Sequence, residues 1–97
     1  MVIQIATFKV KEGMMEEAIE ALKEIVPKVR ESEPGCLQYV ALTVKGRKNK
    51  NSIIFYENYK DDEALQEHVK NIGPTLAKKL LPLCEPGGDF KTCFEII

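Results

Sequence analysis

The segment that decides the fold of this chain is Phe55–His68, which reads FYENYKDDEALQEH. Its first part belongs to the run 52–59, whose β-branched and aromatic side chains favour a strand. The three carboxylates of residues 61–63 follow almost at once, and a helix N-terminus attracts negative charge of this kind. The sequence therefore predicts a strand and a helix that meet at a corner at Lys60.

His68 is the only histidine of the chain and the first candidate for chemistry. If Asp61 caps the helix, His68 lies about two turns, or roughly 10 Å, along the helix axis. Glu57 and Tyr59 share the strand face that points toward the helices, so we expect them to meet His68 in one cleft. An imidazole can accept a proton from an organic substrate near neutral pH. The sequence thus predicts His68 and Glu57 as catalytic residues, with Glu57 orienting the ring.

Each of these residues also has a structural interpretation. His68 falls on an apolar side of its predicted helix, where a lone histidine usually serves packing. The other residues of that side are Leu65, Val69 and Ile72. Glu57 can equally form a hydrogen bond to a helix terminus or a backbone amide. From the residues alone both interpretations stay open.

Three aromatic side chains are candidates for contact with a substrate. Phe55 and Tyr59 share the strand face of Glu57, and Tyr39 lies on a neighbouring predicted strand. Their rings can stack on an aromatic substrate or can serve as ordinary core aromatics. We predict Tyr59, Tyr39 and Phe55 as substrate-binding residues.

The rest of the chain supplies further strands and helices around this segment. The predicted strands are 2–11, 36–45, 52–59 and 90–97, and the predicted helices are 14–33 and 62–70, followed by a short helix opened by Pro74. Pro27 predicts a kink or break in the first helix, and Gly73 with Pro74 predicts the end of the second. The order β-α-β-β-α-β indicates a ferredoxin-like α+β fold for a single domain, 1–97, with an antiparallel sheet and its helices on one face.

The face of the sheet that the helices leave free is predicted to be apolar. If the helices cover the side of Ala6, Phe8 and Tyr59, the other side presents Ile3, Ile5, Val40, Leu42, Ile54 and Tyr56. A contiguous apolar patch of this size usually marks an interface. We therefore expect a homodimer in which two copies pack sheet against sheet.

Charge and hydropathy narrow the classes of partner and compartment. The net charge of −1 argues against nucleic acid, because phosphate binding needs a basic surface. The basic stretch 45–51 carries no aromatic residue to stack on bases, so we interpret it as a solvated hairpin loop. No apolar run is long enough to cross a membrane, and residues 1–4 do not resemble a signal peptide. We expect no membrane partner and a cytoplasmic protein.

The cysteines and the loops point to no cofactor. Cys36, Cys84 and Cys93 are odd in number and lack the spacing of a metal site or a disulfide framework. They are predicted to be reduced thiols without a catalytic role, because no cationic neighbour in the local sequence would activate them. The chain also has no glycine-rich phosphate loop, so neither a nucleotide nor a metal is expected.

The pattern E-x-[aromatic]-x-D-x-E-A-L-x-x-H, here Glu57 to His68, resembles the signature of the antibiotic biosynthesis monooxygenase (ABM) domain family. Two further motifs, 8–13 and 33–39, agree with that family in order and spacing. The resemblance implies a dimeric α+β barrel and a functional histidine at position 68. Tyr59 stands where the family usually has tryptophan. Haem-degrading relatives use a tryptophan and a first-strand asparagine, but this chain has no tryptophan and carries Ala6 at the asparagine position, so haem degradation is not expected.

The activity expected from this resemblance is a cofactor-independent oxidation of an aromatic hydroxy compound or quinol by O2. His68 would remove a phenolic proton, the anion would reduce O2, and a peroxide would collapse to a quinone in an apolar pocket. Two alternatives stay open, because a fold does not decide a reaction. One is an isomerase that acts on a small carbonyl metabolite in the same pocket, and the other is a ligand-binding dimer without turnover.

Overall fold

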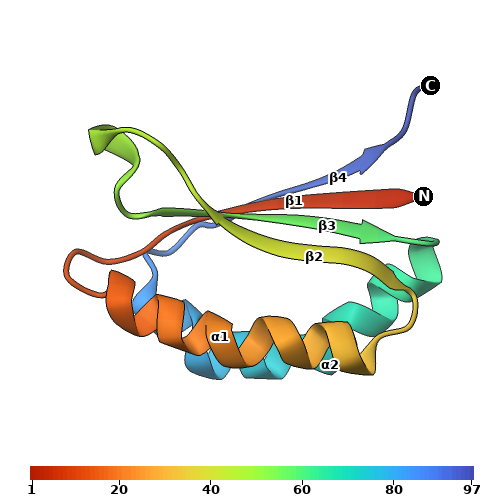
Figure 1. Ribbon diagram of the computed structural model, residues 1–97, viewed down its shortest axis with the longest axis horizontal. Helices are drawn as coiled ribbons and strands as arrows, with labels where there is room; N and C mark the ends of the chain where they lie inside the picture. The colour runs from red at the N-terminus through yellow and green to blue at the C-terminus, as the bar shows by residue number, and fades with distance from the viewer.

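A computed structural model describes residues 1–97 as an antiparallel four-stranded sheet with two helices packed on one face (Figure 1). The strands are β1 (Val2–Lys9), β2 (Cys36–Thr43), β3 (Ser52–Tyr59) and β4 (Asp89–Phe94). The helices are α1 (Met15–Ser32) and α2 (Asp62–Lys79), and short 3-10 turns lie at Arg47–Asn49 and Leu81–Leu83. The strand order β2-β3-β1-β4 confirms the predicted ferredoxin-like fold.

The register of the central strands places the polar candidates at the middle of the sheet. Glu57 on β3 lies opposite Gln4 on β1 and opposite Tyr39 on β2. Residues two apart on a strand point to the same face, so Phe55 and Tyr59 join Glu57 on the side of the helices. All three are buried, which confirms the predicted strand face.

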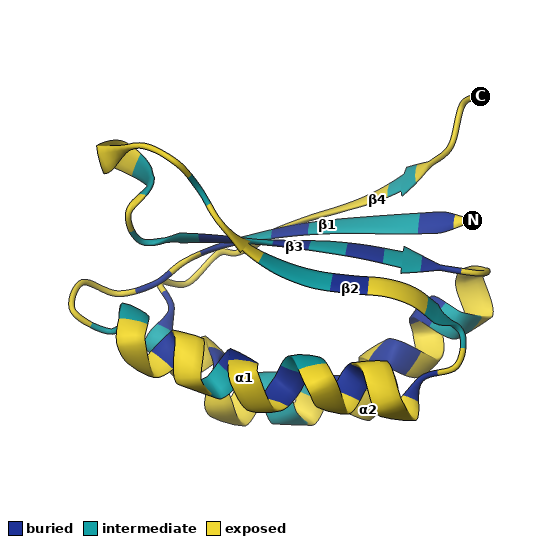
Figure 2. Ribbon diagram, viewed as in Figure 1, coloured by how far each residue is buried: buried dark blue, intermediate teal, exposed yellow.

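The core lies between the sheet and the two helices, and Figure 2 shows the buried stripes of both helices turned toward the strands. Helix α1 buries Ala18, Leu22, Ile25 and Val29. Helix α2 buries Leu65, His68 and Ile72, so His68 occupies a position of the apolar stripe. Neither helix combines the length and the apolar character that a membrane span requires.

Both helices run through their prolines. Of the predicted kink or break of α1, the break is therefore wrong, and so is the predicted end of α2 near Lys70. Helix α1 is continuous across Pro27, and α2 continues across Pro74 to Lys79. Each proline removes a backbone hydrogen bond, but helices in proteins draw most of their stability from packing of their apolar face. Beyond Pro74 that face continues through Leu76 to the fully buried Leu80. Strands β1, β2 and β4 are each shorter than predicted.

The opposite face of the sheet has no helix over it (Figure 1). Its apolar side chains are Ile3, Ile5, Val40, Leu42, Ile54 and Tyr56, and none of them belongs to the buried core. Among them, Leu42 is 45% exposed. The predicted apolar face is therefore present and uncovered within one chain.

Candidate active site

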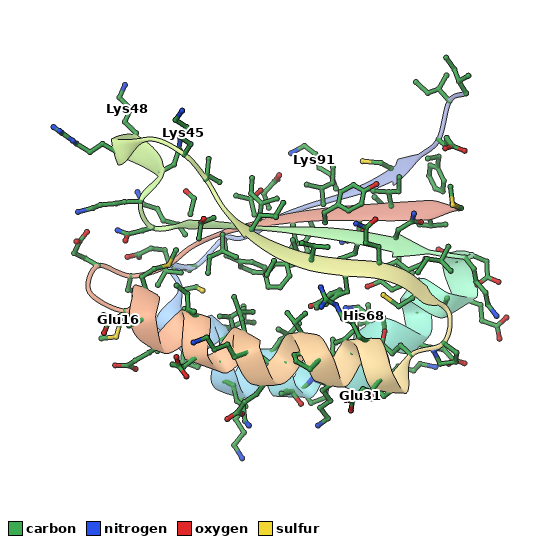
Figure 3. All side chains as sticks on the ribbon, viewed as in Figure 1. Glu16, Glu31, Lys45, Lys48, His68 and Lys91 are labelled. Atoms are coloured by element: carbon green, nitrogen blue, oxygen red, sulfur yellow. The ribbon has the colours of Figure 1, made fainter.

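A cavity of about 230 Å³ lies between α2 and the strands β1 and β3. Ten of its 14 lining residues are hydrophobic. Its polar side chains are Gln4, Glu57 and His68, and Tyr39 also lines it. Figure 3 shows His68 projecting from α2 into the layer between the helices and the sheet. The cavity thus combines apolar walls with a small set of titratable groups, as ligand pockets usually do.

The imidazole of His68 lies between the carboxyl groups of Glu33 and Glu57. Its Nδ1 lies 2.8 Å from Oε1 of Glu33, and its Nε2 lies 3.5 Å from Oε1 of Glu57. The rings of Tyr39 and Tyr59 pack against it with centroid distances of 5.1 and 5.2 Å. Only 5% of the residue is exposed. The ring therefore has one well-defined orientation, which proton transfer at a fixed place requires.

Glu57 faces His68 from the sheet. The Tyr59 hydroxyl donates a hydrogen bond of 2.5 Å to Oε1 of Glu57, so its partner is a side chain and not a helix terminus or a backbone amide. Burial raises the pKa of the Glu57 carboxyl, and the hydrogen bond from Tyr59 opposes this effect in part. A carboxyl of this kind can share a proton with the imidazole beside it.

Glu33 is the residue of this site that the sequence did not reveal. It is the C-cap of α1, it is buried, and its Oε1 lies 2.8 Å from Nδ1 of His68. Its Oε2 accepts a hydrogen bond of 2.8 Å from Asn71, which also donates to the Ser32 hydroxyl. The sequence feature that could have identified Glu33 is its place at the start of the motif 33–39, directly before a proline and a glycine at a helix end.

The loop after Glu33 explains how a helix end reaches His68. A Cβ atom at Gly35 would lie 2.6 Å from the Cβ of Ala64, so only glycine lets the loop approach α2 this closely. The Lys60 amide donates a hydrogen bond of 3.0 Å to the Gly35 carbonyl. Asp61 accepts a hydrogen bond of 2.8 Å from the Ala64 amide, which confirms the predicted cap and fixes the start of α2.

The structure brings two of the three aromatic candidates to the cavity. Tyr39 and Phe55 line it, and their ring centroids are 5.7 Å apart. Tyr59 is fully buried behind His68 and does not line the cavity, so its visible role is to donate to Glu57. Phe8 and Phe90 complete the aromatic wall, in edge-to-face contact with each other. The sequence did not single out these two residues.

The cysteine thiols are poor candidates for nucleophiles in this structure. Burial raises the pKa of the Cys36 thiol to about 11, with help from the carboxylates of Glu33 and Glu57. Burial also raises the pKa of Cys84. All three cysteines are free. No group of three or more histidine, cysteine, aspartate or glutamate side chains has an arrangement that could hold a metal ion.

The sequence profile of the antibiotic biosynthesis monooxygenase family matches residues 1–75. The chain belongs to this family. An ABM protein of known structure, named an antibiotic biosynthesis monooxygenase, is similar with a TM-score of 0.86 and 22% sequence identity over 100% of both chains. The ABM match includes Glu33, Glu57 and His68, and it ends before β4.

Two further solved structures have the same fold. Protein SO0527 from Shewanella oneidensis is 27% identical with a TM-score of 0.80, over 95% of this chain and 87% of that protein. Rv0793 from Mycobacterium tuberculosis is 18% identical with a TM-score of 0.85, over 99% of this chain and 95% of that protein. No curated protein matches the sequence. The likeness to these structures concerns the fold, and the activity has to be argued from the cavity itself.

Proposed function

We propose that this protein is a cofactor-independent monooxygenase that oxidises a small aromatic hydroxy compound with O2. The observation that carries the proposal is a single imidazole, with Nδ1 2.8 Å from Glu33 and Nε2 3.5 Å from Glu57, at the polar end of an otherwise apolar cavity. A base in this setting can ionise a weak acid that binds beside it. Membership of the ABM family supports the choice of O2 as the second substrate.

The cavity suits a ligand of one or two rings. Its volume is about 230 Å³, and apolar protein cavities of about 150 Å³ are known to hold benzene. The ring of the substrate would pack against Phe8 and Phe55, and its hydroxyl would face His68. Burial keeps the pKa of the Tyr39 hydroxyl well above its usual range, so this group stays a hydrogen-bond donor for a phenolate oxygen.

The proposed reaction needs no external reductant. Nε2 of His68 takes the phenolic proton, and the phenolate transfers one electron to O2 to give a phenoxyl radical and superoxide. These combine at the ring carbon para to the oxygen, and the imidazolium returns its proton to the outer peroxide oxygen. Loss of the hydrogen from that carbon then breaks the O–O bond. The products are a quinone and water, so phenol and O2 are fully accounted for.

The apolar walls would favour the step that transfers an electron. A phenolate in water is stabilised by hydration, and a cavity that excludes water removes part of this stabilisation. The substrate anion is then more readily oxidised, while the Tyr39 hydroxyl and His68 offer the oriented dipoles that replace water. The same walls protect the radical pair from side reactions.

We also propose that the functional unit is a homodimer formed through the uncovered sheet face. The support is the contiguous apolar surface of β1, β2 and β3 opposite the helices, which no element of the chain covers. Two such faces related by a two-fold axis would bury each other. His68 and its cavity lie on the helix side, so each protomer would carry its own site.

Oxygen consumption with a panel of one- and two-ring phenols and hydroquinones tests the proposed reaction. For phenols with hydrogen at the para position we expect uptake of one O2 per phenol, and one ¹⁸O atom in the quinone when ¹⁸O2 is used. The His68→Gln protein serves as the control for catalysis at this site. Binding of phenols without O2 uptake would support the non-catalytic dimer. Exchange of a proton α to a carbonyl, observed by NMR, would support the isomerase.

A further inference from the structure

His68 stands in the wall between two cavities of different character. Its ring lines the apolar cavity described above, whereas its partner Glu33 lines a separate polar cleft of about 380 Å³. The cleft lies between the α1–β2 loop and the first turns of α2, and only two of its 11 lining residues are hydrophobic. His68 does not line the cleft, and Glu33 does not line the apolar cavity. The contact of 2.8 Å between them therefore joins the two spaces.

We propose that Glu33 is the positioning residue of this site, which holds the proton of the neutral imidazole on Nδ1 and exchanges that proton with water in the polar cleft. The inference rests on the proposed function in so far as His68 is the base. Nε2 would then keep its lone pair on the side of Glu57, which lines the apolar cavity. A substrate hydroxyl in that cavity would meet the nitrogen that can accept its proton.

The surroundings of Glu33 fit this role. Its backbone amide donates to the Val29 carbonyl and its Oε2 accepts from Asn71, so both the backbone and the carboxyl group are held in place. The hydrogen bond made by one ring nitrogen decides which nitrogen of a histidine carries the proton. A carboxylate offers acceptors only, so a carboxylate at Glu33 pairs with an Nδ1 that donates.

The other groups around the ring agree with this assignment. The groups that face the imidazole are Glu33 from α1, Tyr39 from β2, and Glu57 and Tyr59 from β3. Burial raises the pKa of both tyrosine hydroxyls and that of the Glu57 carboxyl. The groups on the sheet side thus favour their protonated forms, and Glu33 remains as the acceptor on the other side.

A route through Glu33 would connect the Nδ1 proton with water while the apolar cavity stays closed. The neutral ring can exchange its Nδ1 proton through the Glu33 carboxylate with water in the cleft. The proton that Nε2 takes from the substrate goes on to the peroxide oxygen, so the exchange through the cleft leaves the stoichiometry of the reaction unchanged. The contact with Glu33 thus keeps the Nδ1 proton in place when each new substrate binds.

The test uses the fact that the chain has one histidine, so one set of imidazole signals appears in a long-range ¹H–¹⁵N NMR spectrum. In the wild type at a pH where the ring is neutral, we expect the proton on Nδ1. In the Glu33→Ala protein we expect it on Nε2, with kcat lowered at least ~10-fold and KM little changed, as when the partner that orients a functional histidine is lost. Added formate should enter the cleft and restore both the Nδ1 proton and kcat.

Glu31→Ala is the matched control, because Glu31 is an exposed glutamate of the same helix end and lies away from His68 (Figure 3). It should change neither the spectrum nor kcat, with or without formate. A wild-type ring that carries its proton on Nε2 would overturn the inference even if every Glu33 variant failed to fold. A Glu33→Ala protein that formate does not restore would exclude the cleft as the route. If the wild type oxidises no phenol, the proposed function fails, while the NMR spectra with and without formate still decide the role of Glu33.

Discussion

The carboxylate of Glu33 and the imidazole of His68 meet at 2.8 Å although 35 residues separate them in the chain. Two local features make this contact possible. The glycine at position 35 lets the loop after α1 lie against α2, and the Asp61 cap sets where α2 begins and so which way His68 points. Each feature can be removed by a single substitution.

Gly35→Ala should destabilise the protein and loosen the Glu33–His68 contact. The added Cβ would lie 2.6 Å from the Cβ of Ala64, so the loop has to move. Strain of this kind typically costs about 1–3 kcal/mol of unfolding free energy. Urea unfolding measures it, and the Ala64→Gly background provides the control, because it removes the clashing atom. Equal losses in both backgrounds would contradict the steric explanation.

Glu57→Gln should change how stability depends on pH. Burial raises the pKa of Glu57 in the folded protein, so the folded state binds this proton more tightly than the unfolded state does. This tighter binding stabilises the folded protein fully at pH values below the pKa of a glutamate in the unfolded chain, about 4.3. The stabilisation is lost as the pH rises through the higher pKa that Glu57 has in the folded protein. The side-chain amide of the variant has no such proton to lose.

The free energy of unfolding of the wild type should therefore fall relative to that of the Glu57→Gln protein as the pH is raised from about 4 to about 8. Urea titrations at several pH values measure this difference. Glu67→Gln, at an exposed glutamate of α2, is the control and should show no such slope. A difference that grows in favour of the wild type toward neutral pH would show that the Glu57 pKa is lowered instead.

Local chemistry explains what the sequence could predict of this fold. The corner at Lys60 and the cap at Asp61 depend on adjacent residues, and the shared face of Phe55, Glu57 and Tyr59 follows from strand alternation. The end of α2 could not be predicted in the same way. Pro74 locally favours a break, whereas the apolar face beyond it packs through Leu76 and Leu80 in the folded protein, where the helix is continuous.

The candidate site could be predicted only in part, for a related reason. Glu57 and His68 belong to one continuous segment, whereas Glu33 reaches the ring through a loop whose path depends on Gly35. The alternation of side chains along the strand correctly predicts that Tyr59 points toward the helices. It does not predict whether the side chain reaches the cavity. Tyr59 therefore lies behind His68 and not beside the cavity.

Replacement of all three cysteines by serine should leave turnover intact. The pKa of Cys36 is raised to about 11 and that of Cys84 is also raised, so neither thiol is ionised near neutral pH. Some stability should be lost, on the order of 1–2 kcal/mol, mainly because a buried hydroxyl replaces the thiol of Cys84. Oxygen uptake and urea unfolding measure the two effects. Loss of turnover in a well-folded variant would point to a thiol mechanism.

Leu42→Asp should disrupt the proposed dimer. This side chain lies on the uncovered face of the sheet, 45% exposed in one chain, and a dimer would bury an unpaired carboxylate there at a cost of several kcal/mol. Sedimentation should show a monomer or aggregate. Ile19→Asp on α1 is the control, since Ile19 is similarly exposed at 37% but lies on the helix layer. A wild type that sediments as a folded monomer would contradict the dimer itself.

His68→Gln separates catalysis from packing most directly. If His68 is the base, turnover should fall ~10²-fold or more, the usual contribution of a positioned proton acceptor, while phenol binding survives and the melting temperature stays within a few degrees. The glutamine amide cannot take a proton from a phenol near neutral pH, so the variant keeps the binding site and lacks the base.

The packing interpretation predicts the opposite pattern for the same variant. The ring of His68 lies between Tyr39 and Tyr59 and fills a position of the buried stripe of α2. If that were its whole role, glutamine would leave a poorly filled space and a displaced amide, so the variant would unfold early yet turn over normally. Calorimetry and oxygen uptake on the same sample distinguish the two cases. Early unfolding with normal turnover would exclude His68 as the base, and the ligand-binding dimer would then account better for the cavity.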